Sequence, residues 1–170
     1  MAVYSEPGRG TTFRVYLPRA YIDDSRDVAP ADPRTVMGGA ERILLVEDNV
    51  PLRRATARQL TELGYRVLEA EHAVSALLIL AGAEPVDLLF TDVVMPGTMD
   101  GLDLAHEAAR LRPGLRVLLT SGFPGVRGAD IRAGGYPLPL LNKPYSRDAL
   151  ARRIRRVLEG EDEQAFATIV

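Results

Sequence analysis

The most constraining feature of the sequence is a short apolar run that ends abruptly on an acidic residue. Residues 88–91 read Leu-Leu-Phe-Thr, Asp92 follows, and Pro96, Gly97 and Gly101 then break the pattern. An apolar run without alternation is typical of a strand buried on both faces of a parallel sheet. Asp92 is therefore predicted at the carboxyl end of a central strand, where open α/β sheets place their ligands. A carboxylate there can be a nucleophile, a metal ligand or a helix cap.

From Glu41 onward, predicted strands and helices alternate along the chain. Short aliphatic runs predict strands at 43–46, 66–70, 87–91, 115–120 and 138–141. Apolar residues at helical spacing, bounded by caps and breakers, predict the intervening helices. These are a helix between Asn49 and Gly64, helices at 73–81, 102–111 and 126–133, and a last helix that Ser146 or Asp148 opens and Gly160 closes. Such alternation predicts one parallel sheet with right-handed crossovers and helices on both faces.

Two segments precede this α/β region. Within residues 1–18, Phe13, Val15 and Leu17 alternate with more polar residues, which predicts a strand. Val3 and Tyr4, before a Pro-Gly turn, can form its partner in a β-hairpin that is marginal in water by itself. Residues 19–40 are rich in proline, glycine and aspartate, so we expect a flexible linker there. The α/β domain is then expected to span 41–160, with a C-terminal tail at 161–170.

Composition narrows the classes of function. A chain of 170 residues with 46% hydrophobic residues can bury one sizeable core. The net charge of −2, without a basic stripe, argues against nucleic acid as a partner. The absence of cysteine excludes a disulfide framework, thiol catalysis and cysteine metal sites. No apolar run approaches the roughly 20 residues of a membrane span and no secretory signal is found, so we expect a cytoplasmic protein without membrane contact.

Polar side chains follow four of the five predicted strands. They are Glu47 and Asp48, then Asp92, then Thr120 and Ser121, and finally Lys143. Because the carboxyl ends of parallel strands share one edge of a sheet, these side chains can converge. Three carboxylates repel one another and favour a cation, and an all-oxygen donor set suits Mg²⁺. With Lys143 and a hydroxyl at 121 to hold phosphoryl oxygens, the set fits phosphoryl transfer to Asp92.

Each of these residues also has a purely structural interpretation. An aspartate at a strand end is often a cap or a turn residue, and Glu47 and Asp48 before a helix can complement its dipole. Lys143 before a proline can be a solvated surface lysine, and Ser121 can belong to a turn. We favour a shared site because these structural roles would all have to coincide on one edge of the sheet.

Four motifs together resemble the receiver domain of bacterial response regulators. They are residues 43–49 (Ile-Leu-Leu-Val-Glu-Asp-Asn), 92–101 (beginning Asp-Val-Val-Met-Pro-Gly), 118–123 (Leu-Leu-Thr-Ser-Gly-Phe) and 143–145 (Lys-Pro-Tyr). The resemblance covers residues 41–159. It implies the flavodoxin-like (βα)5 fold, a doubly wound parallel α/β sheet with strand order 2-1-3-4-5, an order that the spacing of the strands alone does not give.

The resemblance also implies roles by position. Asp92 takes the position of the phosphoacceptor, Lys143 that of the invariant lysine, and Ser121 that of the switch hydroxyl. Thr120 is less expected as the switch hydroxyl, because the family's small residue, here Gly122, directly follows that hydroxyl. The implied ligands of Mg²⁺ are Glu47, Asp48, Asp92 and the main-chain carbonyl of Val94.

Two positions depart from the family pattern. The acidic pair is Glu-Asp rather than Asp-Asp, as in many receivers fused to kinases, and the longer Glu47 is expected to act through water. The family's switch aromatic, three residues before the lysine, is Leu140. The resemblance therefore implies the hydroxyl half of the usual switch but not its aromatic half.

The N-terminal segment resembles another family. Residues 5–13 and 15–18 are similar to the last glycine box and the closing strand of the histidine-kinase ATPase domain. The asparagine box, the earlier glycine box and the phosphoaccepting-histidine helix of that family have no match. The resemblance implies a remnant that does not bind ATP, placed ahead of the C-terminal receiver of a hybrid sensor histidine kinase.

The function that these resemblances imply is phosphorelay signal transduction. The receiver would take a phosphoryl group onto Asp92 from the phosphohistidine of a histidine kinase or a histidine phosphotransfer protein. It would catalyse its own Mg²⁺-dependent phosphorylation and dephosphorylation, although the kinase core is missing from this chain. The face formed by the fourth helix, fifth strand and fifth helix would then switch and contact a partner or a second copy.

Three alternatives are compatible with parts of the pattern. An aspartyl-phosphate phosphatase generally needs a second aspartate just after the nucleophile, whereas position 94 is Val94. A pseudo-receiver would act as an interaction module without phosphorylation, which the complete set of acidic residues and lysine argues against. A stand-alone, single-domain response regulator would act by binding alone.

Overall fold

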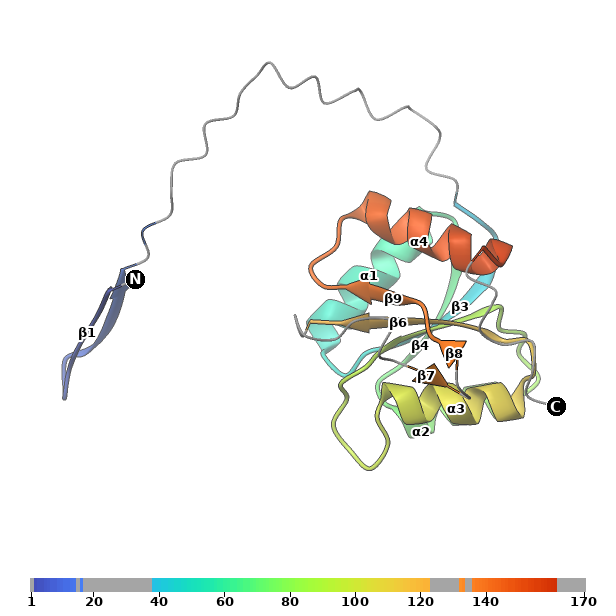
Figure 1. Cartoon of the computed structure of the whole chain (residues 1–170), viewed down its shortest axis with the longest axis horizontal. Helices are drawn as coiled ribbons and strands as arrows, with labels where there is room; N and C mark the ends of the chain where they lie inside the picture. The colour runs from blue at the N-terminus through green and yellow to red at the C-terminus, as the bar shows by residue number, and fades with distance from the viewer. Residues whose placement is uncertain (1, 15, 17–37, 123–131, 134–135, 162–170) are drawn as a thin grey trace, which may run out of the picture. The chain divides into compact units, whose positions relative to one another are not determined.

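The structure is a computed structural model that describes residues 2–14, 16, 38–122, 132–133 and 136–161. The chain divides into two compact units, Met1–Pro33 and Arg34–Val170 (Figure 1). We describe each unit by itself.

The first unit contains the predicted hairpin. β1 (Ala2–Glu6) pairs antiparallel with β2 (Gly10–Arg14), and Val3 lies opposite Phe13. The turn between the strands uses glycines at positive φ, the backbone region that favours glycine. The large side chains stay exposed, with 53% of Val3 and 63% of Phe13 accessible, so the two described strands bury no core between them.

The second unit is built on a five-stranded parallel sheet with the order β4-β3-β5-β6-β9. This is the predicted order 2-1-3-4-5. The strands are β3 (Arg42–Val46), β4 (Arg66–Ala70), β5 (Leu88–Asp92), β6 (Arg116–Ser121) and β9 (Leu140–Asn142). The helices are α1 (Val50–Glu62), α2 (Ala73–Ala81), α3 (Gly101–Leu111) and α4 (Arg147–Glu159).

The helices cover both faces of this sheet, as Figure 1 shows. We call the core on one face the α1/α4 cluster, and it includes Ile43, Leu45, Leu60, Leu88, Phe90, Leu118, Leu150 and Ile154. The core on the other face is the α2/α3 cluster, and it includes Leu44, Val46, Leu80, Leu89, Leu104, Val117 and Leu119. Because consecutive residues of a strand alternate between the two clusters, the central strands are apolar throughout.

Local signals explain where two of the helices begin and end. The Asn49 side chain accepts a hydrogen bond from the Leu52 amide at 3.0 Å and starts α1. Ser146 accepts one from the Ala149 amide at 3.2 Å and starts α4, which ends at Gly160 in the left-handed region. Asn49 and Gly160 are predicted caps, and of the two residues predicted to open the last helix it is Ser146, not Asp148, that caps it. None of the described helices is both long and apolar enough to cross a membrane.

The predicted helix at 126–133 needs a correction at its end. Residues 126–131 lie outside the described part of the chain. Arg132 and Ala133 form the short strand β7 (Arg132–Ala133), which pairs antiparallel with β8 (Tyr136–Pro137). The fifth strand of the sheet likewise begins at Leu140 rather than at Leu138, after Pro139.

Candidate functional site

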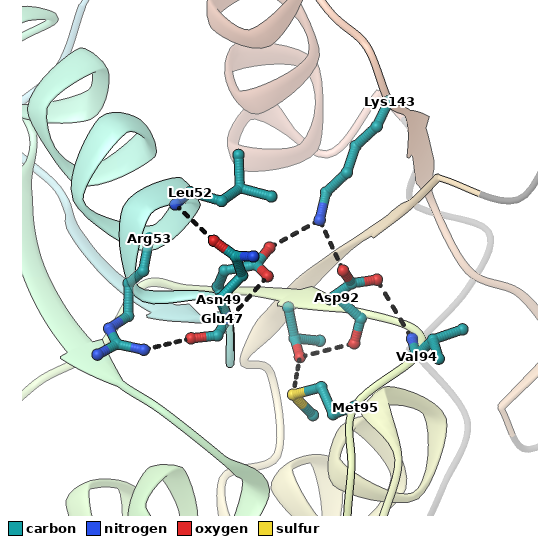
Figure 2. A network of polar contacts seen from close by, with 9 residues as sticks. Glu47, Asn49, Leu52, Arg53, Asp92, Val94, Met95 and Lys143 are labelled. Atoms are coloured by element: carbon teal, nitrogen blue, oxygen red, sulfur yellow. Dashed lines mark hydrogen bonds and ion pairs between the residues drawn. The ribbon is translucent and has the colours of Figure 1, made fainter. Parts of the chain in front are cut away.

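The ends of three strands bring three of the predicted site residues together. Glu47 directly follows β3, Asp92 is the last residue of β5, and Lys143 directly follows β9. The Nζ atom of Lys143 lies 2.7 Å from Glu47 Oε2 and 2.6 Å from Asp92 Oδ2. Figure 2 shows the ammonium group between the two carboxylates. Residues that are 96 and 51 positions apart in sequence therefore meet at one edge of the sheet.

This cluster of charges is largely withdrawn from water. The accessible fractions of the side chains are 6% for Glu47, 13% for Asp92 and 16% for Lys143. Burial alone would lower the pKa of Lys143, but its hydrogen bonds to Asp92 and Glu47 and their negative charge outweigh burial and raise that pKa. Lys143 is thus a firmly protonated point charge, which suits it to hold anionic oxygens.

The remaining carboxylate oxygens are held less tightly. Asp92 Oδ1 accepts a hydrogen bond from the Val94 amide at 3.2 Å, and Glu47 Oε1 accepts one from the Asn49 amide at 3.3 Å (Figure 2). Both distances are at the long end for N–H···O bonds. Each carboxylate therefore has one oxygen held by Lys143 and one oxygen in a long, weak hydrogen bond. A ligand that approaches the second oxygen gives up little hydrogen-bond energy.

The predicted group of three carboxylates is not assembled in this arrangement. Within the described residues, no three His, Cys, Asp or Glu side chains lie together as a metal-binding group. Lys143 lies between Glu47 and Asp92 and balances part of their negative charge. Asp48 is exposed beside the buried Glu47.

The chemistry of these donors nevertheless fits Mg²⁺. Glu47, Asp48 and Asp92 offer only hard carboxylate oxygens, which are the ligands that Mg²⁺ prefers. Three carboxylates and one ammonium leave a formal charge of −2 at this edge of the sheet, which favours a divalent cation. The donor set therefore fits a small, hard ion.

The predicted hydroxyl residues lie at the end of β6. Ser121 is 1% accessible, and its carbonyl accepts a hydrogen bond from the Lys143 amide at 2.8 Å, so the ends of β6 and β9 are joined next to the lysine. Thr120 lies opposite Asp92 in the strand register and is 3% accessible. Leu140, which replaces the family's aromatic residue, is half-buried against the α2/α3 cluster.

Two further residues lie close to the site, and of these Arg53 did not come from the sequence analysis. Arg53, on the first turn of α1, donates a hydrogen bond to the main-chain carbonyl of Glu47 (Figure 2). Tyr145 packs its ring 6.4 Å from that of Phe90, and burial raises its pKa although a hydrogen bond with Thr56 opposes that shift. A basic residue one turn after the Glu-Asp-Asn motif was the available signal for Arg53.

Comparison with known proteins agrees with this geometry. The family model "Response regulator receiver domain" matches residues 43–155. The response regulator receiver protein CpdR of Brucella abortus is 35% identical over 118 residues, which cover 69% of this chain and 97% of CpdR. The crystal structure of the receiver domain from the hybrid histidine kinase CckA superposes with a TM-score of 0.57 at 36% identity, covering 69% of this chain and 98% of that one.

A longer relative matches nearly the whole chain. The sensor kinase CckA of Brucella abortus is 35% identical over 167 residues, which cover 93% of this chain. The match spans only 18% of the length of that kinase. With its sheet order, its Lys143–Asp92 pair and these matches, the chain belongs to the response regulator receiver domain family.

Proposed function

We propose that this receiver accepts a phosphoryl group on Asp92 and so takes part in a phosphorelay. The observation that carries the proposal is the pair of short contacts that join Lys143 to Asp92 and Glu47 at the carboxyl edge of the sheet. A surface lysine would not be held between two carboxylates that are at least 87% withdrawn from water. The arrangement instead keeps a cation beside Asp92, which ends a strand whose preceding residues are all buried.

The chemistry follows from the positions of the side chains. A carboxylate oxygen of Asp92 forms a bond to phosphorus while the bond between phosphorus and the donor's imidazole nitrogen breaks. The imidazole leaves with the electron pair and takes a proton from solvent. Lys143 is positioned to hold an anionic oxygen beside Asp92, and the Ser121 hydroxyl is proposed to bond another.

A divalent ion belongs to the same proposal. Asp48, Asp92, the carbonyl of Val94 and Glu47, directly or through water, would hold Mg²⁺. When bound, Mg²⁺ supplies positive charge that neutralises the phosphoryl oxygens during transfer. Lys143 neutralises part of the acidic cluster when no phosphoryl group is there and remains beside Asp92 when one arrives.

The partners are proposed from the relatives. The match to the sensor kinase CckA extends over 93% of the chain, so it reaches beyond the receiver unit into residues that resemble the kinase ATPase domain. This supports an origin in a hybrid histidine kinase, with a histidine kinase or a histidine phosphotransfer protein as phosphoryl donor. Phosphorylation would be reported at the face to which β9 and α4 contribute, where a partner or a second copy binds.

A second candidate is a receiver that acts by itself. The match to CpdR covers 97% of that response regulator, although only 69% of this chain. The matched part of this chain is therefore as extensive as the response regulator CpdR. Such a receiver would transmit its signal by binding a partner protein.

Fluoroberyllate, an analogue of the phosphoryl group, tests the proposed acceptor. In the presence of Mg²⁺ we expect it to shift the amide NMR signals of residues near Asp92, Ser121 and Lys143. Asp92→Asn is expected to abolish these shifts, and Asp148→Asn, which changes an exposed aspartate on α4, is the matched control and is expected to keep them. Removal of Mg²⁺ with a chelator is expected to abolish them as well. An equal response in wild type and Asp92→Asn would contradict the proposal.

A further inference from the structure

Thr120, near the end of β6, carries a buried hydroxyl group that has no hydrogen-bond partner among the described residues. The residue is 3% accessible, and among the described residues no group forms a hydrogen bond with its Oγ1 atom, which water does not reach. A buried polar atom without a hydrogen bond costs free energy, so native proteins rarely keep one without a reason. Valine has nearly the same shape, suits a strand equally well and would avoid the cost.

The strand register places this hydroxyl beside the phosphoacceptor. Thr120 on β6 lies directly opposite Asp92 on β5. Residues in register on neighbouring parallel strands project from the same face of the sheet. The side chains of Thr120 and Asp92 are therefore neighbours on that face.

The packing of the preceding residues identifies the face. Glu47, Asp92, Thr120 and Lys143 each come two positions after a residue of the α1/α4 cluster, and side chains two apart in a strand share a face. Those four preceding residues are Leu45, Phe90, Leu118 and Leu141. Ser121 comes two positions after Leu119, which belongs to the α2/α3 cluster. Thr120 is thus the hydroxyl on the same side as both carboxylates and the lysine.

We propose that Thr120 is a second hydroxyl ligand of the phosphorylated Asp92 side chain, in addition to Ser121. The hydroxyl lacks an acceptor while Lys143 holds the free carboxylates. A phosphoryl group on Asp92 brings new anionic oxygens to this place, and the Thr120 hydroxyl donates to one of them. The unpaired hydroxyl therefore stabilises the phosphorylated state relative to the free one. This inference rests on the proposed acceptor role of Asp92.

The test compares three variants by titration with fluoroberyllate in the presence of Mg²⁺, followed by amide NMR, and by thermal unfolding. Thr120→Val removes the hydroxyl and keeps the shape, whereas Thr120→Ser keeps the hydroxyl. Thr61→Val is the matched control, because Thr61 is exposed on α1 and its hydroxyl already donates to the Ala57 carbonyl.

We expect Thr120→Val to bind fluoroberyllate about tenfold more weakly, as for the loss of a hydrogen bond to a charged group. Its melting temperature without ligand is expected to equal or exceed that of wild type, because no partner is lost. Thr120→Ser and Thr61→Val are expected to bind within about twofold of wild type.

Two results would overturn the inference about Thr120. One is wild-type affinity in Thr120→Val. The other is a Thr120→Val variant that fails to fold or melts at a lower temperature, since the hydroxyl would then have a structural partner in the free protein. Failure of the proposed function has a different signature, because wild type itself would not respond or Asp92→Asn would respond equally.

Discussion

The strands β2 and β5, which are equal in length, have opposite environments. Every residue of β2 is exposed, including Phe13 with 63% of its surface accessible. Leu88, Leu89 and Phe90 of β5 are completely buried. β2 reads Gly-Thr-Thr-Phe-Arg and pairs with a single strand, whereas β5 begins with three apolar residues, Leu88–Phe90, and lies between β3 and β6.

The difference explains why β5, and not β2, has a candidate functional residue at its end. Because β5 is covered on both faces, its run of apolar side chains can end only where the chain reaches the edge of the sheet. Asp92 stands at that point, where Glu47 and Lys143 arrive from β3 and β9. β2 has the hydrogen bonds of a strand, but no layer of the described residues covers it, and its sequence does not position such a group at its end.

The largest expected effect comes from the core of β5. Phe90→Ala is expected to lower the free energy of unfolding of the receiver unit by about 3–5 kcal/mol, because it empties a fully buried site in the α1/α4 cluster. Urea unfolding followed by circular dichroism measures this. A loss below about 1 kcal/mol would mean that β5 is not the centre of the core.

The next largest effect is expected from removing the charge of Lys143, which contacts Asp92 at the end of β5. Lys143→Met leaves two mostly buried carboxylates without their cation, so we expect a loss of about 3 kcal/mol at neutral pH. The folded-state pKa of Lys143 lies above its ordinary value of 10.5, so its stabilisation is fully present below that pH and is lost as pH rises through the folded-state pKa. Urea unfolding between pH 7 and pH 11 is expected to show a difference between wild type and variant that is constant at first and then shrinks. A difference that widened with pH would contradict this assignment.

A smaller effect is expected from an ion pair near the start of β3. Burial alone would raise the pKa of Glu41, but its hydrogen bond with Arg155 on α4 outweighs burial and lowers that pKa. The pair is partly exposed, so Glu41→Gln is expected to cost roughly 0.5 kcal/mol at neutral pH. This stabilisation is present above the ordinary pKa of 4.5 and is lost as pH falls through the folded-state value. The free energies of unfolding of wild type and Glu41→Gln are therefore expected to converge in acid. A difference in stability that stays constant with pH would argue against the ion pair.

The smallest effect is expected in β2, where Phe13 is the exposed counterpart of the buried Phe90. Phe13→Ala, in β2, is expected to change the stability of the receiver unit by less than about 0.5 kcal/mol, because the ring is already exposed. The same urea experiment as for Phe90→Ala gives the value. A loss as large as that of Phe90→Ala would show that the ring is buried against something that the described residues do not include.

The sequence was sufficient for much of the fold because the signals were local. The apolar run at 88–91, the caps at Asn49 and Ser146 and the stop at Gly160 each fix a strand or a helix end within a few residues. The expected helix at 126–133 was the least regular pattern, and at Arg132 and Ala133 the chain forms a strand instead.

The site was predictable as a set of residues but not as a set of contacts. Strand ends placed Glu47, Asp92 and Lys143 at one edge, but the sequence did not show that the lysine would lie between the two carboxylates. Which partner a charge takes depends on side-chain directions across strands 51 or more positions apart, and no local pattern encodes these. The unpartnered hydroxyl of Thr120 likewise becomes visible only once the register with Asp92 is known.

The most direct test of the central claim is to locate the phosphoryl group itself. The protein is treated with a small phosphoryl donor and Mg²⁺, the acyl phosphate is trapped by reduction, and the modified residue is identified by tandem mass spectrometry. We predict a single modified aspartate, Asp92, and no modification in Asp92→Asn. Modification of another acidic residue in wild type, or of none while the control receiver of a known regulator is modified, would contradict the account.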